Sequence, residues 1–152
     1  METTRIDPFK IIGISVRTTN ENGQSAKDIP FLWNKFFAEN ITEQIPGKIG
    51  KEMYCIYTDY VKDYTQPYTA IIGYKVEDLS TIPDGLVGKS IDVGNYTSFK
   101  AKGKISEDIV FKEWLKIWSS DIDRAYTADF EIYGERSQDP ENAEVAILIA
   151  LK

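Results

Sequence analysis

The stretch Ala125-Tyr126-Thr127-Ala128-Asp129-Phe130-Glu131-Ile132-Tyr133 alternates between apolar and polar residues, which is the period of a β-strand. The two faces of that strand would carry Ala128, Phe130 and Ile132 on one side and Thr127, Asp129, Glu131 and Tyr133 on the other. The first face suits a hydrophobic core. The second holds two carboxylates and a tyrosine, so it either faces solvent or lines a polar, aromatic and anionic site.

Around this strand, the hydrophobic pattern predicts the order β-α-β-β twice, separated by a linker at residues 80–85. The first helix is expected over residues 29–40, with Asp28 as its N-cap and Pro30 in its first turn. The second helix is expected to begin at a Ser106 cap and to run to about Trp118. The predicted strands are residues 9–17, 52–60 and 68–76 in the first half, and 86–93, 95–101, 126–133 and 144–151 in the second.

The two halves match as a repeat. A shift of 76 residues superposes the helix starts, the second strands and the third strands, for example Ile56 on Ile132, and likewise Ile29 on Ile105 and Thr69 on Val145. At this shift Glu131 falls on Cys55. We expect a longer loop after the first strand in the first half than in the second. The prediction is an α+β fold, a tandem repeat with pseudo-two-fold symmetry, antiparallel sheets and a cleft between the halves, with Glu131 as a single carboxylate off the axis. Residues 1–152 would form one domain, with halves at 9–79 and 86–151.

Composition excludes several classes of function. The net charge is −6, the pI is about 4.8 and no basic cluster occurs, so direct nucleic-acid binding is not expected. The chain contains no histidine, which removes Ser-His and Cys-His nucleophile pairs and imidazole metal ligands. Cys55 is the single cysteine, so neither an internal disulfide nor a cysteine zinc cluster can form. We expect no metal or cofactor, no membrane partner and, without a signal peptide, a cytoplasmic protein.

Aromatic residues are abundant, with nine Tyr and three Trp. Five segments rich in them occur in order: Tyr57-Thr58-Asp59-Tyr60, Pro67-Tyr68-Thr69, Ile72-Gly73-Tyr74, Gly94-Asn95-Tyr96 and Arg124–Tyr133. In these segments, and across residues 9–151, the sequence resembles the GyrI-like effector-binding family. That family includes stand-alone integron-cassette proteins and the effector domains attached to AraC- and MerR-type regulators.

The resemblance implies a tandem β-α-β-β (SHS2-like) effector-binding domain. It further implies an aromatic cleft with a glutamate at its base that binds small cationic or amphipathic aromatic molecules. Carried onto this sequence, the glutamate is Glu131, and the ligand-binding set is Glu131, Tyr57, Tyr68, Tyr74, Tyr96, Trp114 and Tyr133.

Several alternatives remain open at this stage. Asp129 is either a pocket residue or a partner of Arg124, and Trp114 and Trp118, four residues apart, fit a helix core as well as a ligand cage. Some members of the family resemble hydrolases of cyclopropane-containing DNA-alkylating compounds, a chemistry that Glu131 could support as general base with Tyr57 or Tyr133 as hydrogen-bond donor. A gyrase-inhibitor-like partner protein rests on the acidic charge alone.

Overall fold

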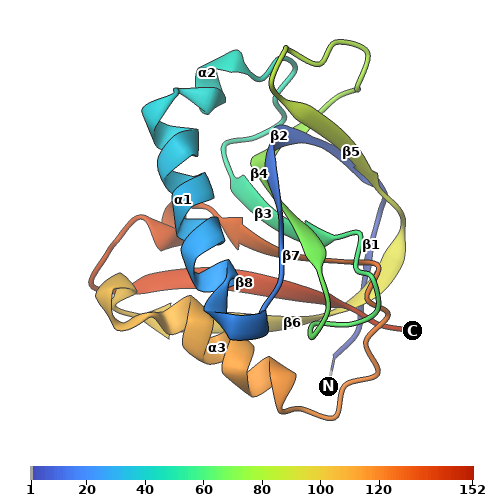
Figure 1. The fold of residues 1–152 in the computed structure, drawn as a ribbon, viewed down its shortest axis with the longest axis vertical. Coiled ribbons are helices and arrows are strands. Elements are labelled where there is room, and N and C mark those ends of the chain that lie inside the picture. The colour runs from blue at the N-terminus through green and yellow to red at the C-terminus, as the bar shows by residue number, and fades with distance from the viewer. Residues whose placement is uncertain (1) are drawn as a thin grey trace.

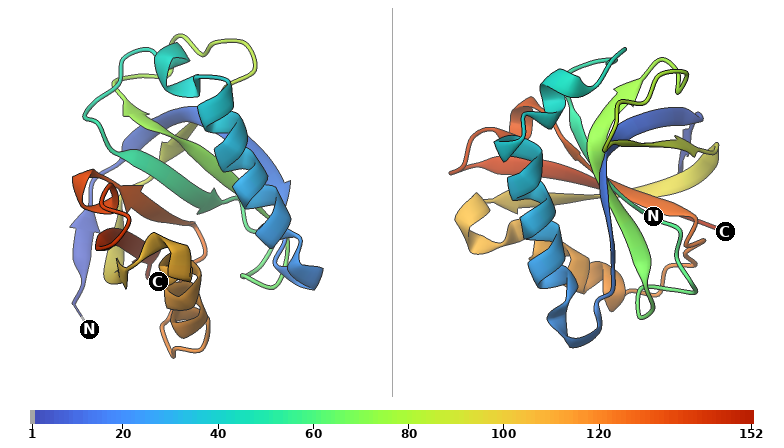
Figure 2. Two further views of the ribbon diagram at one scale, coloured as in Figure 1. Left: turned by 90° about the vertical axis from the view of Figure 1, so that its left-hand side faces the viewer. Right: turned by 45° about the horizontal axis from the view of Figure 1, so that its top comes forward.

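The computed structural model describes residues 2–152 and contains one eight-stranded antiparallel sheet in the order β1-β6-β8-β7-β3-β4-β2-β5. The helices α1 and α3 lie on the same face of this sheet (Figures 1 and 2). The strands are β1 (Thr4–Ile6), β2 (Phe9–Thr18), β3 (Met53–Thr58), β4 (Tyr68–Val76), β5 (Val87–Ile91), β6 (Gly94–Gly103), β7 (Ala128–Tyr133) and β8 (Ala143–Ala150). The helices are α1 (Ser25–Ala38), α2 (Ile41–Gln44) and α3 (Ile109–Trp118).

The predicted repeat is present as β2-α1-β3-β4 and β6-α3-β7-β8, and the strand order is symmetric about the central β7–β3 pair. Cys55 on β3 lies directly opposite Glu131 on β7. These two residues are also equivalent in the repeat, so the pseudo-two-fold axis passes between them. The expectation that Glu131 stands off the axis is therefore wrong: it stands on the axis.

The offset between the halves changes along the chain. It is 85 residues for the first strands (Phe9 to Gly94) and 76 for Cys55 and Glu131, whose partners on the third strands are Ile72 and Ile147, 75 residues apart. The loops after β2 and β6, residues 19–24 and 104–108, are similar in length, so the expectation of a much longer first loop is wrong. The first half instead spends its additional residues on a longer α1 and on α2.

Both predicted helix starts need correction. Helix α1 begins at Ser25, and Asp28 lies inside it, where its carboxylate accepts hydrogen bonds from Thr18 Oγ1 (2.8 Å) and Gln24 Nε2 (3.1 Å). Ser106 belongs to a short 3₁₀ turn, and Asp108, with a left-handed backbone, immediately precedes α3. The position of Pro30 and the local capping pattern suggested later starts because both cues are also compatible with sites inside a helix.

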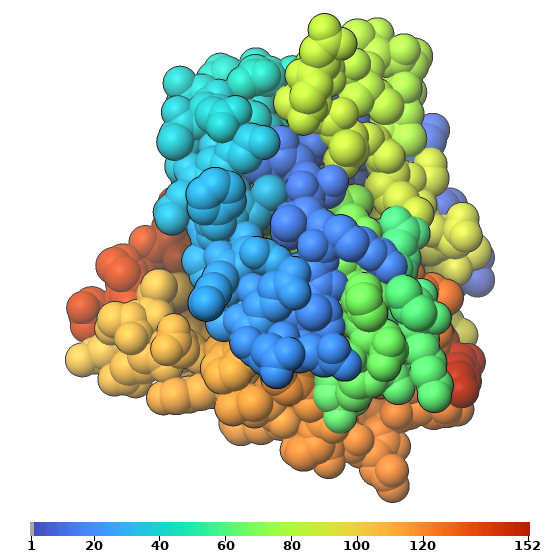
Figure 3. Space-filling view, viewed as in Figure 1, coloured from blue at the N-terminus to red at the C-terminus, as the bar shows by residue number. Residues whose placement is uncertain are grey.

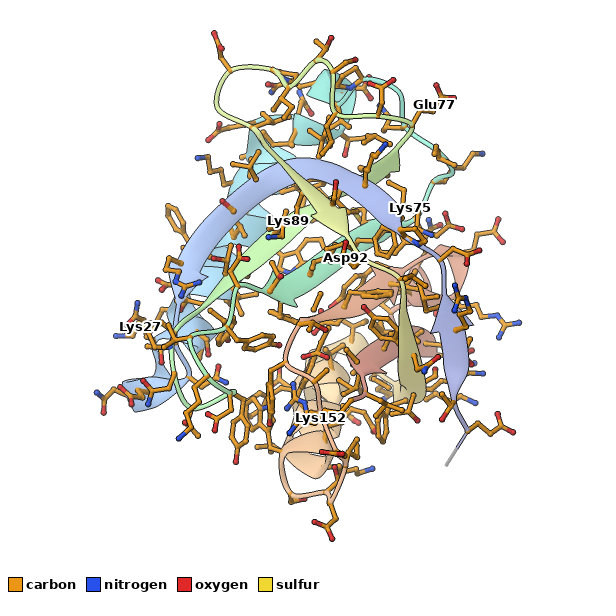
Figure 4. The ribbon with its side chains drawn as sticks, turned by 90° about the vertical axis from the view of Figure 1, so that its right-hand side faces the viewer. Lys27, Lys75, Glu77, Lys89, Asp92 and Lys152 are labelled. Carbon is orange, nitrogen blue, oxygen red and sulfur yellow. The ribbon has the colours of Figure 1, made fainter. Side chains whose placement is uncertain are left out.

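The two halves exchange their leading strands. Strand β1 precedes the first half but pairs with β6, whereas β5 precedes the second half and pairs with β2. Both pairings follow one register, interrupted only at residues 7–8 and 92–93, so they form a bent ribbon that joins the two ends of the sheet. Figure 4 shows β2 arching over the sheet as part of this ribbon.

The sheet has a separate core on each side. On the helix side the core includes Leu32 and Phe36 of α1, Trp114 and Ile117 of α3, and the strand residues beneath them. On the other side a second core is enclosed by the curled sheet, with Phe130 packed against Phe9, Tyr54 and Tyr96. Strand β7 therefore buries both of its faces. No helix within residues 2–152 combines the length and apolar character needed to cross a bilayer.

A buried glutamate in an aromatic cage

Glu131 is buried at the centre of the molecule, with 2% of its surface exposed. Its Oε2 accepts hydrogen bonds from Tyr57 Oη (2.8 Å) and Trp114 Nε1 (2.6 Å), and its Oε1 accepts one from Tyr133 Oη (2.5 Å). We call these four residues the cage. The donors come from three different elements, β3, α3 and β7, so the cage depends on both halves and on the β3–β7 ladder.

Burial dominates the protonation of the cage. Desolvation raises the pKa of Glu131 above its usual value, although the hydrogen bonds from Tyr133, Trp114 and Tyr57 act in the opposite direction. Burial also raises the pKa of Tyr57 and of Tyr133 well above the ordinary tyrosine value, so both hydroxyls stay protonated and donate. The carboxylate is thus held by three neutral donors.

Further aromatic rings surround the cage. The ring of Tyr57 makes edge contacts with Trp114 (5.4 Å between centroids) and Tyr68 (5.8 Å). Trp33 of α1 packs edge-on against Tyr133 at 5.0 Å. The tryptophans expected as helix core are therefore core residues that also contact the polar centre, and Trp114 fills both roles.

A second buried polar cluster lies two residues along the same strand. Asp129, which is fully buried, accepts hydrogen bonds from Arg124 Nη2 (2.8 Å) and Tyr60 Oη (2.6 Å), and its other oxygen accepts one from the Ala150 amide (2.9 Å). The Arg124 guanidinium carbon stands 4.3 Å from the ring centre of Tyr126. Of the two alternatives for Asp129, the pairing with Arg124 is the one observed.

The structure brings together only part of the predicted ligand-binding set. Glu131, Tyr57, Trp114 and Tyr133 are in direct contact, and Tyr68 touches Tyr57. These include the three residues named for hydrolysis, whose catalytic role stays a prediction.

Two predicted members lie elsewhere. Tyr96 is on the opposite face of the sheet, packed against Phe130 in the second core, because strand alternation sends its ring away from the helices. Tyr74 is on the helix side but lies under α1, where it stacks on Phe36 at 6.2 Å and its hydroxyl is 3.4 Å from Thr42 Oγ1.

One residue of the site was missed from the sequence. Tyr60 follows Thr58 and Asp59, and strict alternation would place it on the face away from Tyr57. Asp59 has a positive φ of 52°, however, which turns the chain so that Tyr60 and Tyr57 both contact Tyr68. Only a signal for this left-handed residue could have predicted it.

The cage is closed in this structure. Figure 3 shows the helix face covered by the side chains of α1 and α3. Two surface hollows lie elsewhere: one of about 290 Å³ beside Glu135 and Asn142, and one of about 360 Å³ bordered by Lys75, Glu77 and Asp92 (Figure 4). Neither hollow is lined by Glu131, so the expected cleft is occupied by the cage's own side chains.

Comparisons with known proteins agree with this architecture. The integron cassette protein VCH_CASS2 of Vibrio cholerae has 28% identity and a TM-score of 0.76, with 99% of this chain and 95% of that chain covered. The structure of SAV2435 bound to tetraphenylphosphonium has 13% identity and a TM-score of 0.81, with 99% and 93% covered. YobU of Bacillus subtilis (strain 168), named as a candidate transcriptional regulator, is 26% identical over 153 residues, covering 98% of this chain and 96% of that protein.

A family model matches nearly the whole chain, over residues 2–151. Its description is Cass2, integron-associated effector binding protein, and this confirms the resemblance found in the aromatic segments. The mixed α+β fold with its curled antiparallel sheet matches that of the structural neighbours. The chain belongs to the Cass2 family of integron-associated effector binding proteins.

Proposed function

We propose that this protein binds small hydrophobic cations, typically aromatic or amphipathic, with Glu131 as the charge that receives them. One observation carries the proposal: within residues 2–152 no Lys or Arg forms an ion pair with Glu131, although its carboxylate is buried. Buried charges are normally paired because an unpaired one is costly. A carboxylate supported by neutral donors alone is suited to an external cation.

The surrounding rings favour the same ligand class. A cation beside Glu131 would meet the faces or edges of Tyr57, Trp114 and Tyr133, and each cation–π contact contributes about 0.5–2 kcal/mol. Rings impose little directional selectivity, which suits ligands of varied shape. SAV2435, which shares this fold, is bound to tetraphenylphosphonium, a cation surrounded by four phenyl rings.

Binding requires the cage to open, because Glu131 is almost wholly buried. The most direct opening moves the two tryptophans that cover it, Trp33 on α1 and Trp114 on α3. A ligand cation would then replace the Trp114 hydrogen bond with a full ion pair. Part of the gain in electrostatic energy is spent on this displacement, so we expect moderate affinities.

The central test is the isosteric substitution Glu131→Gln. Gln can accept the Trp114 and Tyr57 hydrogen bonds, but it carries no charge. We expect the affinity for tetraphenylphosphonium, measured by isothermal titration calorimetry or by quenching of tryptophan fluorescence, to fall by at least about tenfold, which is the loss of about 1.4 kcal/mol.

The matched control is Glu107→Gln, which removes the same charge from an exposed turn. It should leave the affinity within twofold of the wild-type value. Equal affinities for wild type and Glu131→Gln, with circular dichroism spectra unchanged, would contradict the proposed role of Glu131.

A further inference from the structure

The side chain of Arg124 is buried but only partly used. One of its nitrogens, Nη2, binds Asp129, whereas Nε and Nη1 are buried without a hydrogen-bond partner, and the side chain is 4% exposed. Buried donors are nearly always paired, and an unpaired donor costs about 1–3 kcal/mol. These two N–H groups are therefore available for an acceptor that the chain itself does not provide.

Arg124 adjoins the cage. The indole of Trp114, which donates to Glu131, has its ring centre 5.8 Å from the Arg124 guanidinium carbon. Asp129 and Glu131 lie on the same side of β7, and residues two apart on a strand are separated by about 7 Å. A ligand with its cation at Glu131 would have only to extend past Trp114 to reach Arg124.

We propose that Arg124 Nε and Nη1 receive a neutral hydrogen-bond acceptor of the ligand, such as an ester, amide or ether oxygen, while the ligand's cation sits at Glu131. This rests on the function proposed above and specifies its ligand class: aromatic cations that carry an acceptor some 7 Å from the charge. Charge balance specifies a neutral acceptor. Arg124 is already neutralised by Asp129, and an added carboxylate would leave an uncompensated buried negative charge.

Three probes on one scaffold test this. They are N-methylquinolinium cations that differ only at one distal substituent, which is ethyl, methyl ester or carboxylate. In wild-type protein we expect the ester to bind about tenfold more tightly than the ethyl compound, because a hydrogen bond to a charged donor contributes about 1.5–3 kcal/mol. The carboxylate should bind more weakly than the ester.

The variant Arg124→Lys isolates the guanidinium. Lys retains the positive charge next to Asp129, but it lacks the planar fork and has no second edge of donors. The ratio of ester to ethyl affinity should fall to near one. The control Arg136→Lys, at an exposed arginine that pairs with Glu144, should keep the wild-type ratio.

The outcomes separate the two proposals. If the ethyl cation binds wild-type protein but the ester has no advantage, Arg124 has only its structural pairing with Asp129 and the inference is overturned, while the role of Glu131 stands. If a carboxylate probe binds at least as well as the ester, the neutral-acceptor class is wrong. If no probe binds, both proposals fail. The wild-type ratios decide the inference even if Arg124→Lys does not fold.

Discussion

Glu131 and Cys55 occupy equivalent positions that face each other across the pseudo-two-fold axis. Strict symmetry would place two carboxylates opposite each other in a buried ladder, where like charges cannot both ionise cheaply. A buried thiol on one side avoids this repulsion. Burial, and next the charge of Glu131, raise the pKa of Cys55 well above its ordinary value, so the thiol stays neutral.

The raised pKa of Glu131 predicts a definite pH dependence of stability. Between the unfolded-state pKa, about 4.3, and the higher pKa in the folded state, the folded protein binds more protons than the unfolded chain. The contribution of Glu131 to the free energy of unfolding is therefore full below that window and is lost as pH rises through it. Because Glu131→Gln has no such titration, its stability relative to wild type should increase from pH 4.5 to pH 8.

Urea unfolding at several pH values measures this difference. The exposed variant Glu107→Gln provides the baseline, since its difference from wild type should change little over the same range. A wild-type protein that gains stability relative to Glu131→Gln as pH rises would mean that the cage's three hydrogen bonds outweigh burial.

At the level of single residues, sequence reasoning succeeded where side chains are close along one strand. Alternation correctly placed Glu131 and Tyr133 together, because no bend separates them. It failed for Tyr60, where the left-handed Asp59 turns the chain, and for Tyr96, whose face depends on its pairing with β8. Neither the bend nor the pairing has a signature in the alternation itself.

Among the elements, β2 and β4 depend on a pair of facing glycines. Gly13 and Gly73 are cross-strand partners, and a Cβ on Gly13 would lie 1.9 Å from the carbonyl oxygen of Ile72, while one on Gly73 would lie 2.1 Å from that of Ile12. Either Cβ would force the two backbones apart. The equivalent positions of the second half, Ser98 and Leu148, carry side chains, so this close approach is specific to the first half.

Gly13→Ala and Gly73→Ala should each destabilise the protein by about 2–4 kcal/mol, measured by urea or thermal unfolding. The matched control is Gly94→Ala in β6, where the new Cβ would meet only Tyr96 at 3.4 Å, an ordinary contact. That change should cost less than about 1 kcal/mol. Similar losses for all three variants would show that the cost comes from glycine replacement in any strand rather than from the close approach.

Element type and order were predictable because strands and helices are encoded in local periodicity. The strands β2, β4 and β8 lie within a residue or two of their predicted positions. The exchange of β1 and β5 was not predictable, because strand pairing depends on distant segments. The short β1 was not predicted at all.

The whole molecule folds as a unit that cannot be divided at its linker. The β3–β7 ladder joins the halves, β1 and β5 are exchanged between them, and both main cores take residues from each half. A fragment of residues 1–82 would lose the partners of β1, of β3 and of one edge of β2. We expect this fragment and its complement, 83–152, each to lack a cooperative urea transition, since chains this short have little core to spare.

Mixing the two fragments should restore the far-ultraviolet circular dichroism spectrum and a cooperative transition. The midpoint of that transition should rise with concentration, because association becomes part of folding. The cage supplies a second readout, since Tyr57 lies in the first fragment while Trp114 and Glu131 lie in the second. Tetraphenylphosphonium binding should therefore appear only in the mixture. A fragment that unfolds cooperatively by itself would show that the halves are independent domains, and the site would then be an interface between them.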